Sequence, residues 1–593
     1  MFALLAPYSN AQNKRIQIEF SGFVLSDSLT GKDVTTFVRN DQQQIHITHE
    51  DINMWCDKAI YYKNDNFIEA FSNVRMQQGD SINMKADYVE YSGKTQLAFA
   101  SGDVILTDSQ STLTTDTLYY YRVKQQAFYR SKGKVVRDSS GTITSQIGRY
   151  YMNLKKYQFL KDVVLTNPDY TINTNHLDFY SETGHAYLYG PSTIVGEDTK
   201  IYCELGFYNT NNDTGYFVKN SRIDYNNRVV EGDSMYFDRK RSFASASNNI
   251  KVTDTINKSI IKGHYAEIHH KKDLVFITKR ALAITVQEND SIYVHADTLM
   301  VTGKPEHRIT RAYYNAKIYK SDMSGKADSI HADHKTGITK LINLSRFSSG
   351  DAFSAAHKPV MWNIKNQMTG DTIQLISNTE TKQLDTLKVF NNAFLISKDT
   401  ISENGYNQIK GQKLIGLFEN NALYNVDIIK NAEVIYYSRN GQNELIGINK
   451  SKSGSINIKI TDNEINRIRL INQIDGTLYP ESQFPEKARK LRGFDWREDE
   501  RPKSVDDLFS DDPPLKLPVI KGIEEAIPDD DFFDNDLLNR IEKATEDDTK
   551  DKKQKTKQNK ESKRIPKAIL KKRDSLKNNS LPTKKTLIKS KKQ

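Results

Sequence analysis

The fold is decided by one pattern that occurs in Met54-Trp-Cys-Asp-Lys-Ala-Ile-Tyr61, Met84-Lys-Ala-Asp-Tyr-Val-Glu-Tyr91 and Leu113-Thr-Thr-Asp-Thr-Leu-Tyr-Tyr120. Each stretch reads apolar, any, small, Asp, any, apolar, any, aromatic. Looser copies continue to Gln412, at spacings of about 28–33 residues as far as Asp297 and about 36–41 residues beyond it. Periods of this length are typical of proteins that stack one supersecondary unit many times.

Each copy has a second half, an apolar strand that starts about 17–20 residues after the Asp position. It is seen in Asn73-Val-Arg-Met76, Asp103-Val-Ile-Leu106, Asp162-Val-Val-Leu165 and Asn249-Ile-Lys-Val252. Turn-forming residues such as Ser92-Gly93-Lys94 separate the halves. With 31 Tyr and 25 Phe but only 14 Pro, the composition suits pleated, half-buried surfaces. The sequence therefore predicts an all-β protein, an elongated stack of units of two or three short strands.

The Asp position of the repeat is predicted to be a structural corner. Apolar residues three before it and two and four after it cannot share one face of a regular strand, whose side chains alternate. A bulge or corner here would restore a common inward face, and short polar side chains favour such corners. We expect these anchors at Asp57, Asp87, Asp116, Asn175, Asp233, Asp297, Asp333 and Asp371.

A ladder of cation-binding carboxylates is the alternative for the same positions. Gln146, His264 and Gln412 interrupt such a row, as does Cys203, and hard cations need oxygen ligands. The only other cysteine is Cys56, so a disulfide framework or a cysteine-based zinc site is excluded. We therefore expect neither a metal nor another cofactor.

Apolar residues around the anchors are predicted to line a continuous interior. One unit cannot bury its apolar face alone, whereas stacked units can. The ends of such a stack expose edge strands to which other β chains can pair. The lining candidates are Met54, Val74, Met84, Val89, Tyr91, Val104, Leu106, Leu113, Leu118, Val135, Ile143, Val163, Leu165, Ile172, Leu177 and Phe179.

The two ends of the chain differ from the repeats. Residues 1–11 resemble the last part of a secretory signal peptide, because a short apolar run precedes the small residues Ser9-Asn-Ala11. Residues 550–593 hold 18 Lys and Arg against 3 Asp and Glu, so their net charge of +15 leaves −5 on the rest of a chain whose total is +10. Residues 503–593 are predicted to be a disordered tail, acidic and then basic. Contact with anionic lipid headgroups and a purely solubilising role are both open for the basic part.

Three further segments lie between these ends. We expect the main β-repeat domain over residues 12–301 and continuing repeats or a second β module over residues 302–480. Residues 481–502 are expected to be a C-terminal cap or a docking segment, since Phe494 and Trp496 stand there among charges.

Signatures of catalysis are missing from the sequence. It contains no Gly-x-Ser-x-Gly, phosphate-binding glycine loop, dinucleotide fingerprint or His-Glu-x-x-His motif. The many carboxylates follow repeat and turn positions, and none is singled out as half of an acid/base pair. No module that reads nucleic acid is found. We expect a protein that is not an enzyme and does not bind nucleic acid.

The repeats resemble the OstA-like (organic solvent tolerance) family, which is related to the LptA periplasmic bridge and the N-terminal domain of LptD in lipopolysaccharide transport. The pattern apolar-x-small-Asp-x-Leu-x-Tyr, followed by Gly/Asn-Asp/Asn-Val, carries the resemblance and is clearest over residues 44–301. It implies an open, V-shaped β-jelly roll whose apolar groove holds lipopolysaccharide acyl chains. It also implies LptC-like and LptD-like partners joined edge to edge, and a dozen units leave end-to-end self-association open.

The resulting hypothesis is an exported, lipid-binding protein of the periplasm, peripheral to the inner and outer membranes, that carries lipopolysaccharide or a related glycolipid to the outer membrane. Two alternatives stay open. The first is a structural or interaction solenoid with a closed core. The second is a polysaccharide lyase or glycoside hydrolase built on a β-helix.

Overall fold

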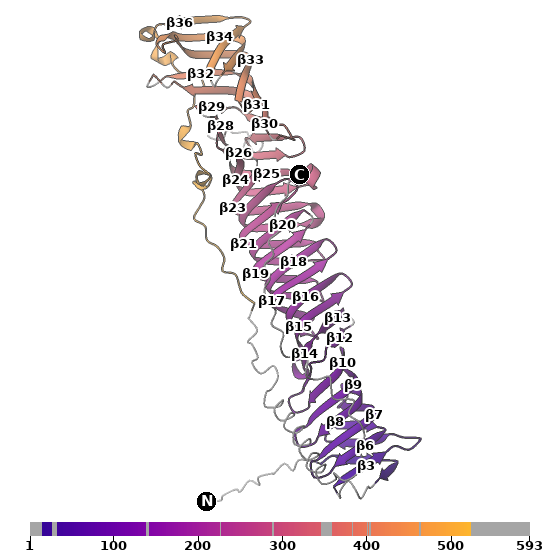
Figure 1. Ribbon diagram of the computed structural model, residues 1–593. Helices are drawn as coiled ribbons and strands as arrows, with labels where there is room; N and C mark the ends of the chain where they lie inside the picture. The colour runs from indigo at the N-terminus through magenta and orange to yellow at the C-terminus, as the bar shows by residue number, and fades with distance from the viewer. Residues whose placement is uncertain are drawn as a thin grey trace, which may run out of the picture. The chain divides into compact units, whose positions relative to one another are not determined.

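Antiparallel strands form nearly the whole of the structure, a computed structural model that describes residues 15–523 except 26–32, 138–140, 226, 287–289, 345–357, 364, 382, 400, 403–404, 421 and 462–463. These residues lie in one compact unit, in which the strands stack in chain order (Figure 1). The prediction of an elongated all-β stack is confirmed. None of the described residues belongs to a helix long and apolar enough to cross a membrane.

The strands fall into three groups along the chain. The first group is β1 (Gln17–Phe20), β2 (Phe23–Leu25), β3 (Val34–Val38), β4 (Ile45–His49), β5 (Ile52–Cys56), β6 (Lys58–Tyr62), β7 (Phe67–Gln78), β8 (Ile82–Ser92), β9 (Leu97–Thr107), β10 (Thr112–Tyr121), β11 (Gln126–Tyr129), β12 (Gly133–Arg137), β13 (Gly141–Ser145) and β14 (Ile147–Tyr151). The second is β15 (Lys156–Asn167), β16 (Tyr170–Tyr180), β17 (His185–Gly196), β18 (Thr199–Asn209), β19 (Thr214–Tyr225), β20 (Arg228–Asp238), β21 (Phe243–Asp254), β22 (Ser259–His269), β23 (Leu274–Val286), β24 (Ser291–Thr302), β25 (Ile309–Lys320) and β26 (Met323–Asp333). The third is β27 (Ile338–Ile342), β28 (Val360–Asn363), β29 (Asn366–Thr369), β30 (Thr372–Ser377), β31 (Leu384–Lys398), β32 (Tyr406–Glu419), β33 (Ala422–Arg439), β34 (Leu445–Thr461), β35 (Glu464–Ile471) and β36 (Asp475–Tyr479). Single 3-10 turns are η1 (Met152–Leu154), η2 (His270–Lys272), η3 (Pro305–His307), η6 (Glu481–Gln483), η7 (Glu486–Ala488), η8 (Glu498–Glu500) and η9 (Asp506–Phe509).

Consecutive strands pair with each other along the stack. From β15 to β26, each strand forms an antiparallel ladder with the next one. Elsewhere two short strands replace one long strand, as where β5 and β6 both pair with β7, or β13 and β14 with β15. The interruptions lie at Asp57 and Gln146. The strand therefore breaks at the Asp position of the repeat, where the sequence predicts a corner.

Uninterrupted strands bend at the same place. The ladder of β7 and β8 shifts register between Phe71 and Val74, and the partner residue left out is Asp87. On the β7 side, Ser72 and Asn73 take left-handed φ angles of 62° and 51°, a conformation that Asn, Asp and Gly tolerate best. Double left-handed corners recur at Gly102-Asp103, Lys161-Asp162, Lys219-Asn220, Asn248-Asn249, Lys279-Arg280, Tyr314-Asn315, Asn391-Asn392 and Lys430-Asn431.

An amide–carboxylate hydrogen bond joins neighbouring strands at many corners. The second corner residue donates its side-chain N–H to the anchor carboxylate of the adjacent strand. At Asp57, burial raises the pKa, but hydrogen bonds from Asn73 and Gln44 outweigh this and hold the pKa below its usual value. The bonds are Asn73 Nδ2 to Asp57 at 2.6 Å, Asn249 Nδ2 to Asp233 at 2.7 Å, Asn315 Nδ2 to Asp297 at 3.1 Å and Asn392 Nδ2 to Asp371 at 3.2 Å.

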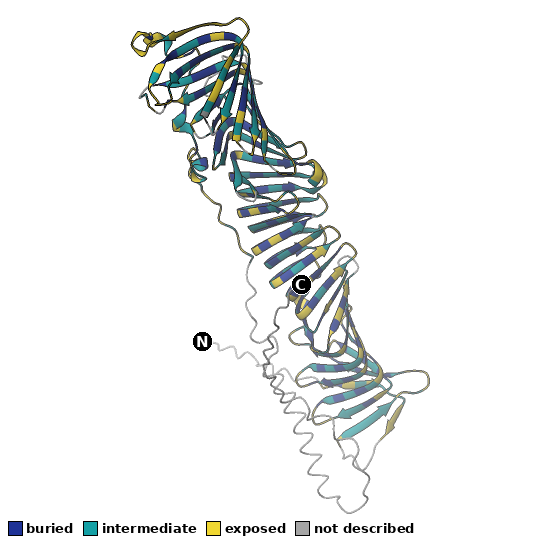
Figure 2. Cartoon of the chain, turned by 45° about the horizontal axis from the view of Figure 1, so that its top comes forward, coloured by how far each residue is buried: buried dark blue, intermediate teal, exposed yellow. Residues whose placement is uncertain are grey.

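The bend points apolar residues on both of its sides into one interior. In β8, Met84 and Ala86 are buried before Asp87, while Val89 and Tyr91 are buried after it. The buried phase therefore moves by one residue at the anchor, which is what the spacing of the apolar residues required. Figure 2 shows buried residues alternating with less buried ones along the strands.

Two expectations from the sequence are corrected. Asp333 is not a corner: it ends β26, and its carboxylate accepts N–H bonds from Lys335 at 3.0 Å and Thr336 at 3.3 Å in a turn. The corner of this strand lies at Asp328, which the ladder of β25 and β26 leaves unpaired. The prediction chose Asp333 because the apolar-x-small-Asp pattern also occurs, by chance, at the turn that follows. Residues 503–521 are ordered against the stack, as described below, whereas residues 1–11 and 524–593 lie outside the described residues.

Replacing Asn73 by Val tests the corner. A β-branched residue is strained at positive φ and cannot donate to Asp57, so we expect N73V to lower the free energy of unfolding by about 2 kcal/mol. Asn73→Gly removes only the hydrogen bond and should cost about 1 kcal/mol. The matched control is Asn83→Val on the exposed face of β8, expected to change stability by less than about 0.5 kcal/mol. Denaturant unfolding measures all three, and equal losses for N73V and N83V would contradict the assignment.

Candidate functional site

The corners divide the stack into two arms, which we name by their inward side chains. Along the aliphatic arm, one inward residue of each strand lies directly opposite the corresponding residue of the next strand. Such a row buries apolar area continuously along the stack. It consists of Met54, Met76, Met84, Leu106, Leu113, Val135, Ile143, Leu165, Ile172, Ile194, Ile201, Ile223, Val230, Val252 and Ile261.

The aromatic arm faces this row with large and small residues mostly in alternation, so that rings fill the space left above Ala and Gly. Tyr150 and Tyr157 are stacked with ring centroids 4.0 Å apart. The row, again of directly opposed residues, is Tyr91, Ala98, Tyr120, Ala127, Tyr150, Tyr157, Phe179, Ala186, Tyr208, Gly215, Phe237 and Ala244.

The sixteen lining candidates named from the sequence all lie in this interior. Each is at most 2% exposed. Most belong to the aliphatic arm, whereas Val89, Tyr91, Leu118, Leu177 and Phe179 belong to the aromatic arm. The structure brings all of them together as a packed core, so a lipid can enter only if the two arms part.

The side opposite the corners, where the turns of the two arms meet, is named the mouth. At its N-terminal end, a His49 ring nitrogen lies 2.7 Å from the Tyr91 hydroxyl across the mouth. The Tyr120 hydroxyl donates to Gln78 in the same way. Arg122 reaches Asp51 at 2.5 Å from the opposite arm. Burial raises the pKa of Asp51, but bonds from Gln78 and Arg122 outweigh this and lower it.

Further along, the same kind of contact closes the next part of the mouth. The Tyr150 hydroxyl of the aromatic arm donates to Asp108 of the aliphatic arm, and Lys155 lies 3.9 Å from the same carboxylate. Beside them, the hydroxyls of Ser111 and Tyr157 are 2.7 Å apart. These polar groups are satisfied by the opposite arm, so closing the mouth leaves few buried donors without partners.

The last cross-arm contacts that we find among the described turns involve β19 to β25. The rings of Tyr225 and His270 meet at 3.9 Å, and burial lowers the pKa of His270. Arg308 pairs with the buried Asp254 across the mouth. Hydrogen bonds, an ion pair and ring contacts thus join the tips of the two arms at several places between His49 and Arg308.

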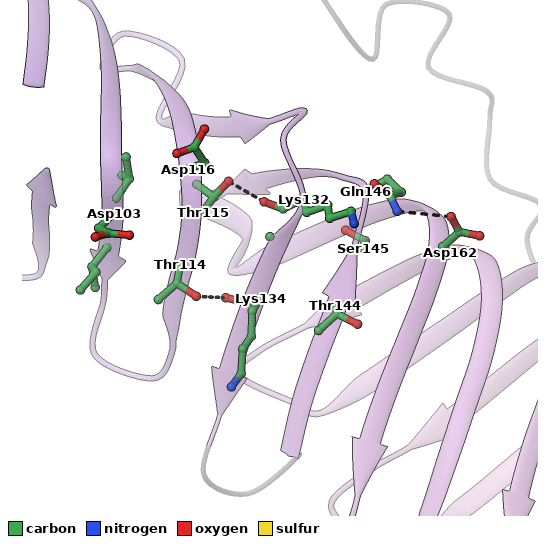
Figure 3. A pocket seen from close by; sticks show the side chains of 13 residues that line it. Asp103, Thr114, Thr115, Asp116, Lys132, Lys134, Thr144, Ser145, Gln146 and Asp162 are labelled. Carbon is green, nitrogen blue, oxygen red and sulfur yellow. Dashed lines mark hydrogen bonds between the residues drawn. The ribbon is translucent and has the colours of Figure 1, made fainter. Parts of the chain in front are cut away.

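Polar hollows lie on the outer side of the corners, away from the interior. The larger, of about 860 Å³, is shown in Figure 3. Asp103 and Asp116 line it together with Lys132 and Lys134, and Gln146 donates to Asp162 at 3.4 Å, as the dashed line marks. Charges of both signs therefore line this hollow.

A C-terminal segment, residues 481–521, runs along the stack and is named the strap (Figure 1). Two fully buried glutamines bind its backbone in the same way. Gln408 donates to the Arg489 carbonyl at 2.7 Å and accepts the Leu491 N–H at 2.8 Å. Gln367 donates to the Asp495 carbonyl at 2.6 Å and accepts the Arg497 N–H at 2.7 Å. Each side-chain amide therefore holds the strap like one step of a β ladder.

Apolar packing and ion pairs fix the rest of the strap. Its Phe484 and Leu491 are buried in a cluster with β31 to β34, against which Phe494 and Trp496 also pack. Further on, the buried ammonium of Lys317 contacts Asp511 at 3.1 Å. The contacts that follow are His295 Nε2 to Asp512 at 2.9 Å, Asn248 Nδ2 to the Pro518 carbonyl at 3.0 Å and the Tyr216 hydroxyl to the Lys521 carbonyl at 2.9 Å.

Sequence reasoning missed the mouth and most of the strap. Residues such as Gln408, His295 and Arg308 are polar, and in isolation each resembles an exposed strand or turn residue. One signal was available: charged or tyrosine residues recur at the turns in Asp51, Asp108 and Arg122. The sequence does not show which of these turn residues meet across the mouth, because that depends on how far the two arms are displaced along the stack relative to each other.

Comparison with protein families matches residues 14–175 to the model of the OstA-like protein. This part of the chain is similar to that family, and we name it the OstA-like segment. The OstA-like segment holds the first four corners that the sequence indicated, Asp57, Asp87, Asp116 and Asn175, and the resemblance predicted from the repeats is confirmed there. No curated protein matches the chain.

Among solved structures, the crystal structure of LptH, the LptA homologous periplasmic component of the lipopolysaccharide transport device of Pseudomonas aeruginosa, is similar to the chain. The match covers 23% of this chain and 94% of that chain, with 14% sequence identity and a TM-score of 0.20. A TM-score this low supports no argument about function.

The strap gives a pH dependence that can be tested. Glu500 accepts bonds from Arg497 at 2.6 Å and from Lys326 at 3.0 Å, and the Arg497 bond is the main reason that its pKa falls to about 2. Because the folded pKa is lowered, the stabilisation is present above about pH 4.5 and is lost as the pH falls toward 2. Glu500→Gln should lower stability by about 2 kcal/mol at pH 7, and the curves of the two proteins should converge near pH 2. Unfolding midpoints measured across this range test it; a gap that stays constant down to pH 2 would count against the assignment.

Proposed function

We propose that this protein is a non-catalytic lipid carrier of lipopolysaccharide transport, which holds acyl chains of lipopolysaccharide or a related glycolipid between its two arms. The observation that carries the proposal is the aliphatic row, an unbroken line of directly opposed apolar side chains from Met54 to Ile261. The row begins within the OstA-like segment and runs past its end. With strands about 4.8 Å apart, it extends for roughly 65 Å.

The chemistry of the interior fits an acyl chain. Its lining is almost wholly aliphatic and aromatic, so a hydrocarbon chain that replaces contacts between the arms meets surfaces of the same polarity. What must be broken to admit it are the polar contacts at the mouth, each of which contributes on the order of 1 kcal/mol. We therefore propose that the arms separate at the mouth and pivot about the corners, where the amide–carboxylate hydrogen bonds stay intact.

Location and partners follow from the same proposal. We propose that the protein acts in the periplasm, where a carrier of lipopolysaccharide between the two membranes has to work. The ends of the stack expose strands that can extend into a neighbouring sheet. We propose LptC-like and LptD-like β-jelly rolls as the partners at those ends.

One observation favours a second candidate, a structural or interaction solenoid. The interior is packed, and the cross-arm bonds close it over the whole aliphatic row. A protein whose arms never part would show the same packing. The third reading, a polysaccharide-cleaving enzyme on a parallel β-helix, has less support, because the strand pairings described here are antiparallel.

Photocrosslinking distinguishes the first two candidates. A photoreactive residue at Val104, which is 1% exposed and faces the interior, should crosslink to glycolipid when the protein is made in cells that contain lipopolysaccharide. The matched control is the neighbouring Ile105, which is 36% exposed and faces outward, and should crosslink at least tenfold less.

Native mass spectrometry of the unmodified protein supplies a second measurement that does not depend on the substituted core. Bound lipid in a reproducible ratio is expected. Absence of lipid in the spectrum, together with equal labelling at positions 104 and 105, would refute lipid carriage and leave the closed solenoid.

A further inference from the structure

The mouth carries a cation that the folded chain does not neutralise. Arg228 begins β20, two residues before Val230 of the aliphatic row, so its side chain leaves the strand on the inward face. The residue is 4% exposed. Its Nη2 is buried and has no hydrogen-bond partner among the described residues. A buried guanidinium with an unused N–H is costly, because water no longer solvates that N–H and no acceptor takes the place of the water.

A second buried guanidinium adds to this positive charge. Arg308, also 4% exposed, reaches across the mouth and takes Asp254 as its partner. Asp254 is already bonded to the backbone N–H and side chain of Asn257, so its oxygens are occupied. Burial and the charge of Arg308 lower the pKa of Arg228 to about 10, and the opposing effects of Asp254, directly opposite on β21, and of Asp273 do not offset them.

A third guanidinium, that of Arg239, also lies at the mouth, nearer to the N-terminal end of the stack. Arg239 of the aromatic arm crosses the mouth to the Tyr170 ring, with its guanidinium carbon 5.1 Å from the ring centre, and donates weakly to the Asp169 carbonyl at 3.5 Å. In the described part of the chain it forms no ion pair. This differs from the N-terminal part of the mouth, where Arg122 and Lys155 each have a carboxylate partner.

We propose that Arg228, with Arg308 beside it, is an anion site at the mouth that receives a phosphate group. A guanidinium group binds phosphate oxygens through paired N–H bonds. Two neighbouring guanidinium groups, those of Arg228 and Arg308, suit the double negative charge of a phosphate. The proposal rests on the proposed function to this extent: a phosphorylated lipid whose chains enter beside Val230 would place its headgroup phosphate at Arg228. Lipid phosphate and free phosphate share this chemistry, and the experiment separates them.

The first experiment uses inorganic phosphate and the full chain. Phosphate should raise the unfolding temperature relative to chloride at equal ionic strength, because it binds only the folded state. Arg228→Gln should weaken the apparent affinity for phosphate about tenfold or more, as expected for losing one charge-assisted pair. The same variant should be at least as stable as the parent without phosphate, since it removes an uncompensated buried charge.

Arg222→Gln is the matched control. Arg222 is on the neighbouring strand β19, faces outward, is paired with Asp224 at 2.6 Å and has a side chain that is 47% exposed. This variant should keep the full response to phosphate. A shift that is absent from the parent protein, or that is equal in R228Q and R222Q, overturns the anion site.

The second experiment uses vesicles and a photoreactive residue at Val252, which is 3% exposed and lies directly opposite Val230 in the aliphatic row. Vesicles that contain phosphatidic acid, whose headgroup is a phosphate monoester, should give several-fold more interior crosslinking than vesicles of phosphatidylcholine alone. Arg228→Gln should remove that difference while R222Q keeps it. If phosphate stabilises through Arg228 but both vesicles crosslink equally, the site binds free phosphate and the lipid assignment is overturned.

The two experiments also distinguish failure of this site from failure of the proposed function. Interior crosslinking that is the same in R228Q and the parent supports lipid carriage and refutes the phosphate site. A phosphate response that depends on Arg228, with no lipid in the interior from either vesicle, supports the site and refutes lipid carriage.

Discussion

Every strand that serves both arms has to bend in its middle without leaving its hydrogen-bonded ladder, and the rest of the structure depends on how it does so. Two successive left-handed residues, such as Ser72 and Asn73, make the turn, and the second of them ties its side chain to the anchor of the adjacent strand. Strict alternation along a straight strand would point Met84 and Val89 to opposite faces. The bend returns both to one interior, so a single local device creates the core.

The interior and the mouth contribute in different ways. Burying one aliphatic side chain contributes about 1.5–3 kcal/mol, so each residue of the row from Met54 to Ile261 contributes more than a typical polar contact at the mouth. A hydrocarbon guest could take over such contacts with little loss, because they are not directional. Polar contacts at the mouth, such as those of Arg122 and Arg308, are individually weaker and cannot be replaced by an acyl chain. In the proposed lipid carrier, the cost of opening would therefore lie mainly at the tips of the arms.

The strap alters the mechanics of the stack. In a repeat array each unit contacts only its neighbours, so stability is nearly a sum of local terms. Residues 481–521 contact strands as distant in sequence as β32 and β19, through Gln408 at one end and Tyr216 at the other. Such contacts couple units that would otherwise be independent. They also restrain the C-terminal part of the stack, while the described strap does not reach the OstA-like segment.

Sequence alone determined the repeat, the all-β class, the corners and the identity of the inward residues, because a strand reports its faces through local periodicity. All sixteen lining candidates lie in the interior, whereas Asp333 lies in a turn five residues after the corner, where the same pattern occurs. Tertiary structure decided what periodicity does not encode: that the arms close, that Arg308 meets Asp254 while Arg228 finds no such partner, and that residues 503–521 are ordered. These contacts join residues dozens to hundreds of positions apart, and their side chains are the polar ones that sequence patterns assign to solvent.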